Sequence, residues 1–248
     1  MRSFSAGCIL IPMLLRELRT AVYEANLELV KRGLVLYTFG NASGIDREQG
    51  LVAIKPSGVD YDDLRPELMV VTDLDGKVVE GTLKPSSDLD THTLLYREFP
   101  TIGGVVHTHS EFAASFAQAG MEIPALGTTH ADYFYGPVPC TAPLTDEEIG
   151  GRYVHATGLA IVRHFAATAE RAAIDPLAVP ACLVAGHGPF AWGRDAHQAA
   201  HNAVILEAVA RMAYRTLTLK ADAVGVSQAL LDRHYFRKHG PGATYGQG

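Results

Sequence analysis

The chain has 248 residues, of which 48% are hydrophobic and 19% charged, with a formal net charge of −6 and a pI near 6.0. These values are typical of one soluble α/β domain with a full core, and they exclude the strongly basic surface of a general nucleic-acid-binding protein. No apolar run reaches the roughly 18 residues of a membrane span, and three scattered cysteines predict neither disulfides nor a cysteine zinc site. We therefore expect a cytoplasmic protein with neither a membrane nor a nucleic-acid partner.

The first twelve residues precede the first periodic segment of the chain. They resemble a secretion signal only faintly, because the apolar run is short, Pro12 interrupts it and no small-x-small cleavage site follows. We predict that residues 1–12 form a flexible extension and that residues 13–248 form a single domain.

The first hundred residues contain both helical and strand patterns. Apolar side chains recur every three to four positions over residues 14–32, which predicts an amphipathic helix ended by Gly33. The glycine- and serine-containing residues 40–44 predict a tight loop. Strands are predicted over residues 34–39 and 51–54, a β-hairpin over 69–72 and 77–79 with its turn at Asp75-Gly76, and a helix over 89–99 before Pro100.

Two histidines, His107 and His109, follow a run of glycines and β-branched residues at 102–106 that predicts a buried strand. Side chains two residues apart on a strand point to the same face, so both imidazoles would face one point in space. Zinc binds neutral imidazole nitrogens, and a catalytic zinc has three protein ligands and one open position. Two histidines at a strand end are also common as polar residues that enter a loop, so a metal site requires a partner elsewhere.

A third imidazole, His187, stands between two glycines just after residues 181–185, which predict another buried strand. Residues 127–136 are dense in polar and aromatic side chains without any period, which predicts a functional loop. The basic, aromatic tail from residue 233 predicts a segment that docks on some other surface, whose identity the sequence leaves open. Helices are predicted over residues 110–119, over 145–168 with a Thr145-x-x-Glu148 capping box, and from 195 to 219, and we interpret His155, His164, His197 and His201 as surface residues.

Seven blocks in the order of the chain resemble the L-ribulose-5-phosphate 4-epimerase family, which lies within the class II aldolase/adducin-head superfamily. The blocks are Gly40-Asn41-Ala42-Ser43, Lys55-Pro56-Ser57-Gly58-Val59, Ser86-Ser87-Asp88, His107-Thr108-His109-Ser110, Gly127-Thr128-Thr129-His130-Ala131-Asp132-Tyr133, Gly186-His187-Gly188-Pro189-Phe190 and Tyr245-Gly246-Gln247. The resemblance extends from Met13 to the C-terminus. It implies an α/β fold, a three-layer α/β/α domain with a central, mostly antiparallel sheet, and a homotetramer of four-fold cyclic symmetry with its sites between neighbouring subunits.

The resemblance also implies roles for individual residues. The metal ligands are His107, His109 and His187, with Asp88 as the fourth, and the cofactor is one zinc ion per subunit or another divalent metal. The catalytic acid and base are Asp132 and Tyr245, and Tyr245 reaches in from the adjacent subunit. The residues expected to contact a sugar-phosphate substrate are Gly40, Asn41, Lys55, Ser57, Gly58, Ser86 and Ser87.

The implied reaction is the metal-dependent epimerisation of L-ribulose 5-phosphate to D-xylulose 5-phosphate. The hydrogen on carbon 4 is not next to the carbonyl, so inversion by simple deprotonation is hard. Cleavage of the bond between carbons 3 and 4 avoids this problem, because the aldehyde product can rotate and add again from its other face. Two proton-transfer groups on opposite faces are then required. Whether the pathway is arabinose, ascorbate or another pentose route stays open.

Two alternatives within the superfamily stay open. Fuculose-phosphate-type aldolases carry a catalytic glutamate where this chain has Asp88, a shorter carboxylate better suited to staying near the metal, which favours the epimerase. The adducin head is a non-catalytic scaffold with the same fold. A scaffold has no reason to keep His107, His109 and His187 together.

Overall fold

The computed structural model describes residues 13–169, 171–240 and 242–243, and the strands of this part form one sheet in the order β4-β3-β2-β1-β5-β7-β6. Each neighbouring pair in the sheet is antiparallel. The strands are β1 (Asn41–Asp46), β2 (Leu51–Ile54), β3 (Val70–Asp73), β4 (Val78–Glu80), β5 (Gly104–His107), β6 (Ala181–Val184) and β7 (Gly188–Gly193). The helices are α1 (Arg16–Lys31), α2 (Leu89–Glu98), α3 (Glu111–Gln118), α4 (Thr128–Ala131), α5 (Asp146–Gly150), α6 (Tyr153–Phe165), α7 (Ala196–Leu219) and α8 (Gln228–Phe236).

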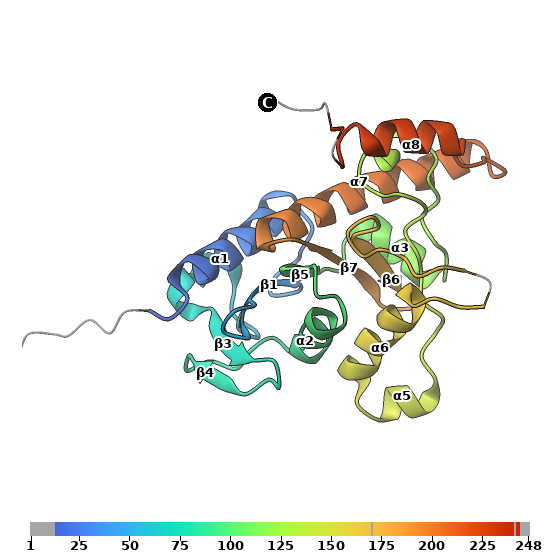
Figure 1. Cartoon of the computed structure of the whole chain (residues 1–248). Helices are drawn as coiled ribbons and strands as arrows, with labels where there is room; N and C mark the ends of the chain where they lie inside the picture. The colour runs from blue at the N-terminus through green and yellow to red at the C-terminus, as the bar shows by residue number, and fades with distance from the viewer. Residues whose placement is uncertain (1–12, 170, 241, 244–248) are drawn as a thin grey trace, which may run out of the picture.

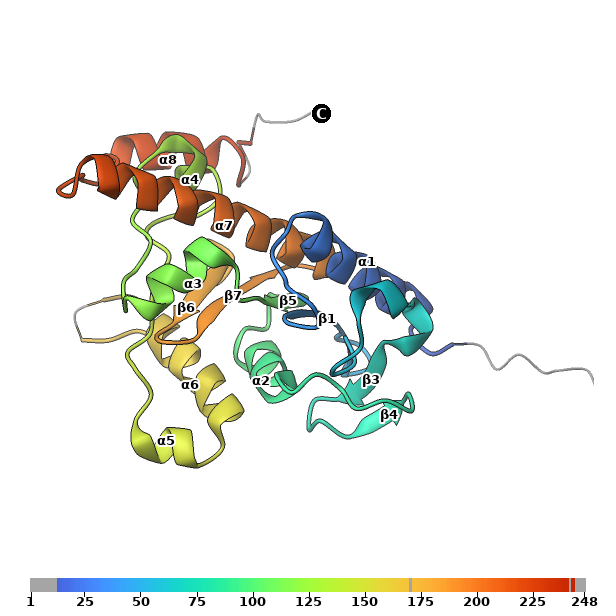
Figure 2. The same ribbon diagram turned by 180° about the vertical axis from the view of Figure 1, so that it is seen from behind.

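Helices cover both faces of the sheet, which confirms the predicted three-layer α/β/α fold (Figures 1 and 2). Helices α1, α3 and α7 lie on one face, over a core that includes Ala42, Val106 and Ala191. Helices α2 and α6 lie on the other face, over a core that includes Val105 and Trp192. Because successive strand residues point to opposite faces, the central strands are buried on both sides.

Several local predictions are confirmed. The helix expected over residues 14–32 is α1, and Gly33 after it has a φ of +68°. The hairpin around Asp75-Gly76 is β3–β4, and the long helix is α7, whose buried side includes Ala199, Ala203 and Ala210. Thr145 and Glu148 form the expected capping box at the start of α5, although the helix predicted over 145–168 is divided into α5 and α6. These elements have strong local periodicity or turn chemistry, so the sequence is sufficient to predict them.

The prediction of a strand at residues 34–39 followed by a loop at 40–44 is wrong. Leu36, Tyr37 and Phe39 are 69%, 86% and 58% exposed, and the strand begins at Asn41. The residues of β1 have low β-propensity, but β1 pairs with β2 on one side and β5 on the other. Gly44 also lets α1 approach closely, since a Cβ there would lie 2.8 Å from Leu18 Cδ1. Tertiary pairing therefore decides this segment against its local preference.

Three further elements were not predicted from the sequence. Residues 188–193, for which the sequence predicts no element, form the strand β7. Residues 128–131, inside the predicted functional loop, form the one-turn helix α4, and α8 begins at Gln228, before the predicted tail. Gly188 and Pro189 are unusual in a central strand, so the sequence pattern does not predict β7.

The predicted extension at residues 1–12 and the predicted catalytic Tyr245 lie outside the described residues, so the domain boundary at residue 13 stays a prediction. None of the described helices combines the length and the apolarity that crossing a bilayer requires.

His130 generates a test of the fold at acid pH. Its Nε2 donates to the carbonyl oxygen of Gly136 at 2.7 Å, and burial lowers its pKa to about 4. Because the unfolded imidazole titrates near pH 6.5, the unfolded chain binds a proton that the folded chain does not, so stability is lost as the pH falls from about 6.5 to about 4. His130→Gln keeps an amide donor near Gly136 but does not titrate. Between pH values of about 7 and 4.5, the variant should therefore lose about 2–3 kcal/mol less unfolding free energy than the wild type.

The measurement is urea unfolding at both pH values, followed by the fluorescence of Trp192, which is the chain's single tryptophan and is buried. An equal loss of stability in both proteins would mean that His130 is not kept neutral by burial.

Candidate metal and anion site

Three histidines from two separate parts of the chain converge at one end of the central strands. His107 is the last residue of β5, His109 follows it, and His187 lies in the turn between β6 and β7. β5 pairs with β7 so that His107 lies opposite Phe190, which brings the turn at His187 beside the end of β5. One ring nitrogen from each histidine lies within 4.8 Å of the other two, and the ring centroids are 4.8–5.1 Å apart. This confirms the predicted convergence of the three imidazoles.

The hydrogen bonds of these rings leave nitrogens available for a metal. His107 Nδ1 donates to the carbonyl oxygen of Pro189 at 3.0 Å, and its Nε2 lies 3.0 Å from His109 Nε2. On the third ring, His187 Nδ1 lies 3.3 Å from the hydroxyl of Tyr153. Burial lowers the pKa of His107 to about 3, and the nearby His187 and His109 act in the same direction. Neutral imidazoles with lone pairs that face one point fit a divalent metal ion.

Two glycines allow the backbone to pass close to these histidines. Gly40 has a φ of +75°, and a Cβ there would lie 2.7 Å from Val35 Cγ1 and 3.0 Å from the carbonyl oxygen of His107. A Cβ on Gly188 would lie 2.9 Å from the carbonyl oxygen of Thr108. A larger residue at either position would therefore displace the backbone that carries the candidate ligands.

Asp88, the predicted fourth ligand, lies beside the histidines at the start of α2. Its Oδ2 accepts a hydrogen bond from Asn41 Nδ2 at 2.7 Å. Burial raises the pKa of Asp88, but the imidazoles of His107 and His92 and the bond from Asn41 together lower it below its ordinary value. Asp88 is not in the group of described side chains whose ligand atoms lie within 4.8 Å of one another, so its coordination of the metal stays a prediction.

The predicted metal residues and the predicted phosphate residues line a single cavity of about 520 Å³. Sequence reasoning had identified eleven of its lining residues, namely Gly40, Asn41, Lys55, Ser57, Gly58, Ser86, Ser87, Asp88, His107, His109 and His187. It had missed Thr38, Phe39, Pro56, Tyr153 and Val154. Tyr153 and Val154 come from the start of α6, where the helical pattern of the sequence carries no signal for a cavity.

Two loops that carry serines, residues 55–58 and 84–88, form the part of the cavity next to α2. Their backbones are joined, because Ser57 N donates to Lys84 O at 2.9 Å and Ser86 N donates to Lys55 O at 3.0 Å. The Lys55 side chain is buried, and its Nζ donates to Val59 O at 2.9 Å, which holds the first loop closed. Helix α2 begins directly after Ser86, Ser87 and Asp88, so the positive end of its dipole adjoins the cavity. Serine hydroxyls and a helix N-terminus are groups that recognise a phosphate.

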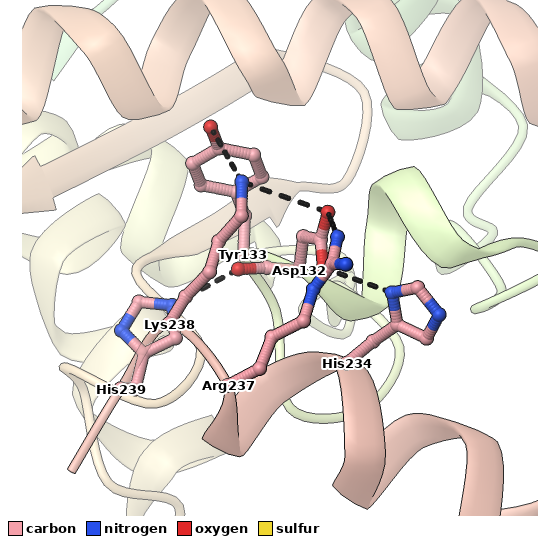
Figure 3. Close-up of polar contacts among 6 residues, drawn as sticks. All are labelled: Asp132, Tyr133, His234, Arg237, Lys238 and His239. Atoms are coloured by element: carbon pink, nitrogen blue, oxygen red, sulfur yellow. Dashed lines mark hydrogen bonds and ion pairs between the residues drawn. The ribbon is translucent and has the colours of Figure 1, made fainter. Parts of the chain in front are cut away.

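Asp132 lies outside this cavity, directly after α4 and against the end of α8 (Figure 3). Its carboxylate accepts hydrogen bonds from His234 Nδ1 at 3.0 Å and from Arg237 at 2.8 and 3.1 Å, and Lys238 Nζ is 3.5 Å away. Burial raises the pKa of Asp132, but the bonds from Arg237 and His234 lower it below its ordinary value, so the carboxyl group is ionised at neutral pH. Sequence reasoning had predicted a docked tail but not these partners of Asp132.

The cluster around Asp132 and the three-histidine site lie apart within one chain. Helices α4 and α8 lie at the opposite end of the molecule from the β3–β4 hairpin, and they do not line the cavity (Figures 1 and 2). The structure therefore does not bring Asp132 to the histidines of its own chain.

Of the four histidines interpreted as surface residues, His197 and His201 on α7 are exposed, whereas His155 and His164 on α6 are half-buried.

Comparisons with known proteins agree with this geometry. The model of the Class II Aldolase and Adducin N-terminal domain family matches residues 20–214. The chain is 52% identical over 233 residues to the L-ribulose-5-phosphate 4-epimerase UlaF of Salmonella paratyphi A and to that of Salmonella typhi, across 94% of this chain and 100% of each relative.

Solved structures with the same fold include two aldolases. An L-fuculose 1-phosphate aldolase has a TM-score of 0.73 at 24% identity, over 89% of this chain and 95% of its own. The L-fuculose-1-phosphate aldolase of Thermus thermophilus has a TM-score of 0.64 at 23% identity, over 84% of this chain and 98% of its own. At these identities the likeness shows the fold alone, whereas the family match extends over most of the sequence. The chain therefore belongs to the Class II Aldolase and Adducin N-terminal domain family.

Proposed function

We propose that the protein is a metal-dependent epimerase that interconverts L-ribulose 5-phosphate and D-xylulose 5-phosphate. The observation that carries this proposal is the single cavity in which three convergent imidazoles lie beside two joined serine loops and the start of a helix. A metal centre next to an anion site fits a phosphorylated sugar. The relatives that share 52% identity over the length of the chain are named L-ribulose-5-phosphate 4-epimerases.

His107, His109 and His187 would hold one divalent ion, with Asp88 as the proposed fourth ligand. Zinc is the proposed metal because imidazole ligands suit it well, although cobalt and manganese accept similar ligands. When bound, the ion supplies Lewis-acid stabilisation of negative charge on substrate oxygens.

The proposed reaction cleaves the bond between carbons 3 and 4 and then forms it again. Removal of the proton from the carbon 4 hydroxyl starts the cleavage, which yields a dihydroxyacetone enediolate and glycolaldehyde phosphate. Ser57, Ser86 and Ser87 are proposed to hold the phosphate, so that the aldehyde stays in the cavity while it rotates. Addition to the other face of the aldehyde, with return of a proton to the oxygen on carbon 4, gives the epimer.

We propose that Asp132 and Tyr245 act on the cavity of a neighbouring subunit in a homotetramer of four-fold symmetry. Asp132 does not line the cavity of its own chain. Phe39, which does line it, and the neighbouring Leu36 and Tyr37 are exposed, and a second subunit would cover this apolar stretch. An ionised Asp132 can accept the proton from the carbon 4 hydroxyl in one direction, and Tyr245 is the proposed counterpart on the other face.

The second candidate function is a class II sugar-phosphate aldolase of the fuculose-phosphate type, which the shared fold supports. Asp88, in place of the glutamate of those aldolases, and the identity to epimerases favour epimerisation. A non-catalytic scaffold like the adducin head is disfavoured by the convergent histidines. A cytoplasmic location and a place in arabinose, ascorbate or other pentose metabolism are proposals that rest on the substrate class.

The metal site is tested by removal of one ligand. His109→Asn should weaken the affinity for zinc by more than about tenfold, since the loss of even an outer-shell partner commonly costs that much. His109 is exposed, so the free energy of unfolding should change by less than about 0.5 kcal/mol. Zinc content after equilibrium dialysis against a competing chelator measures the affinity. His197→Asn, an exposed histidine on α7, is the matched control and should bind zinc like the wild type.

The reaction is tested by a coupled assay for D-xylulose 5-phosphate formed from L-ribulose 5-phosphate. We expect turnover that a chelator abolishes and added zinc restores, because the enediolate requires a Lewis acid. Mass spectrometry of the products separates the two candidate functions, since accumulation of free glycolaldehyde phosphate would support the aldolase and contradict the epimerase.

The sharing of sites between subunits is tested by mixing two inactive variants. His109→Asn removes a metal ligand, and Asp132→Asn removes the proposed base, so each homotetramer should have little activity. In a mixed tetramer, some cavities would combine the intact histidines of an Asp132→Asn chain with the intact Asp132 of a neighbouring His109→Asn chain. Activity should then return. Differently tagged chains, co-expressed and purified through both tags, provide the sample. If the mixed tetramers are as inactive as the two parent variants, either both residues act in the same subunit or Asp132 is not catalytic. A Tyr245→Phe chain mixed with His109→Asn in the same way tests Tyr245.

A further inference from the structure

A buried column of polar side chains joins α2 to β1 beneath the proposed metal site. Asp88, His92 and Tyr96 follow one another at four-residue steps along α2, so they share one side of it. Asn41 and Ser43 alternate on β1 and point to the same face of the sheet. Asn41 bonds to Asp88 at 2.7 Å, and Ser43 Oγ lies 2.7 Å from both His92 Nδ1 and Tyr96 Oη.

The donors and acceptors of this column favour one tautomer of His92. If Tyr96 donates to Ser43 and Ser43 donates to His92 Nδ1, both hydroxyl protons are used and His92 carries its own proton on Nε2. If instead His92 Nδ1 carries the proton and donates to Ser43, and Ser43 donates to Tyr96, the phenol proton has no acceptor among the described side chains. Each arrangement of these fully buried groups therefore leaves one donor unspent, which is His92 Nε2–H in the first and the phenol in the second. The first arrangement is favoured, because its unspent donor lies on the same side of α2 as the Asp88 carboxylate, one turn away.

The remaining donor, His92 Nε2–H, lies near the metal site. It has no hydrogen-bond partner among the described protein groups, and neither does the buried Oδ1 of Asn41. Asp88 precedes His92 by one helical turn, and the two side chains interact electrostatically. The His92 ring also meets Phe190 edge to face at 6.2 Å, and Phe190 stacks on His107 at 4.2 Å. A fully buried donor one helical turn from a carboxylate indicates a role beyond packing.

We propose that His92 is a positioning residue, whose Nε2–H is aimed by the hydroxyl of Ser43 toward the Asp88 carboxylate and keeps that carboxylate charged and in place for the metal. This inference rests on the metal site of the proposed function and assigns a role to a residue outside the cavity lining. Hydrogen bonds to ligating carboxylates fix their orientation, and their loss commonly weakens metal binding about 10- to 100-fold.

Two variants of His92 distinguish the roles of its two ring nitrogens. In His92→Asn, the amide can replace Nδ1 beside Ser43, but no atom replaces Nε2. In His92→Gln, the amide nitrogen reaches the position of Nε2. Titration with Co²⁺, followed by its visible absorption bands, measures affinity and ligand geometry without any substrate. We expect His92→Asn to weaken Co²⁺ binding by about tenfold or more and to shift the bands, and we expect His92→Gln to stay within about threefold of the wild type.

Tyr96→Phe is the matched control, because it removes a buried hydroxyl from the same column and leaves His92 Nε2 in place. It should lower the urea midpoint of unfolding as His92→Asn does, yet bind Co²⁺ within about threefold of the wild type. The proposal is overturned if His92→Asn binds Co²⁺ normally, or if all three variants weaken binding equally. Because no substrate is used, a wild type that binds Co²⁺ but lacks epimerase activity would contradict the proposed function and leave this test intact.

If the His92 variants do not fold, the tautomer in the wild type still tests the proposal. The ¹⁵N NMR spectrum of protein with labelled histidines reports which ring nitrogen of each neutral imidazole carries the proton. The His92 signals are those that shift when Ser43 is replaced in Ser43→Ala. We expect His92 in the Nε2–H form, and the Nδ1–H form would overturn the inference.

Discussion

The site depends on the pairing of β5 with β1 on one side and β7 on the other. This pairing places His107 opposite Asn41 and opposite Phe190, so the two loops that follow β5 and precede β7 meet at one end of the sheet. A shift of one residue in either ladder would turn His107 to the opposite face and separate it from His187. The backbone hydrogen bonds and the two-sided core that hold β5 therefore also determine the geometry of the metal site.

Burial then determines the charge state of the groups that meet there. His107 stays neutral because it is removed from water, whereas Asp88 stays ionised because Asn41 and the surrounding imidazoles favour its charged form. A charge inside a protein needs compensation. A divalent cation would add to the compensation that Asn41 and the imidazoles already give to Asp88, so the electrostatics of the cavity favour a metal. The polar column of α2 and β1 extends the same arrangement beneath the site.

The chain separates its chemical groups into two places. The cavity combines imidazoles with serine loops, whereas Asp132 does not line it and is bound by His234 of α8 and by Arg237 directly after α8. If Asp132 is catalytic, as proposed, it acts on another copy of the chain. The consecutive exposed residues Leu36, Tyr37 and Phe39, of which Phe39 lines the cavity, fit the same proposal, because a contiguous apolar patch of this kind can mark an interface. Assembly and catalysis are then linked in the proposed enzyme.

The sequence by itself determined the helices with strong period, the β3–β4 hairpin, the three histidines and the serine loops, because each carries a signal in a short stretch of residues. It did not reveal that residues 41–46 form a central strand or that residues 188–193 form β7, since their propensities are poor and pairing partners far along the chain override them. The tertiary structure alone likewise decided the contacts of Tyr153 and His92 with the site and the partners of Asp132. Their roles arise from proximity across the fold, which no local pattern records, and only the packed sheet and its helices bring them to their partners.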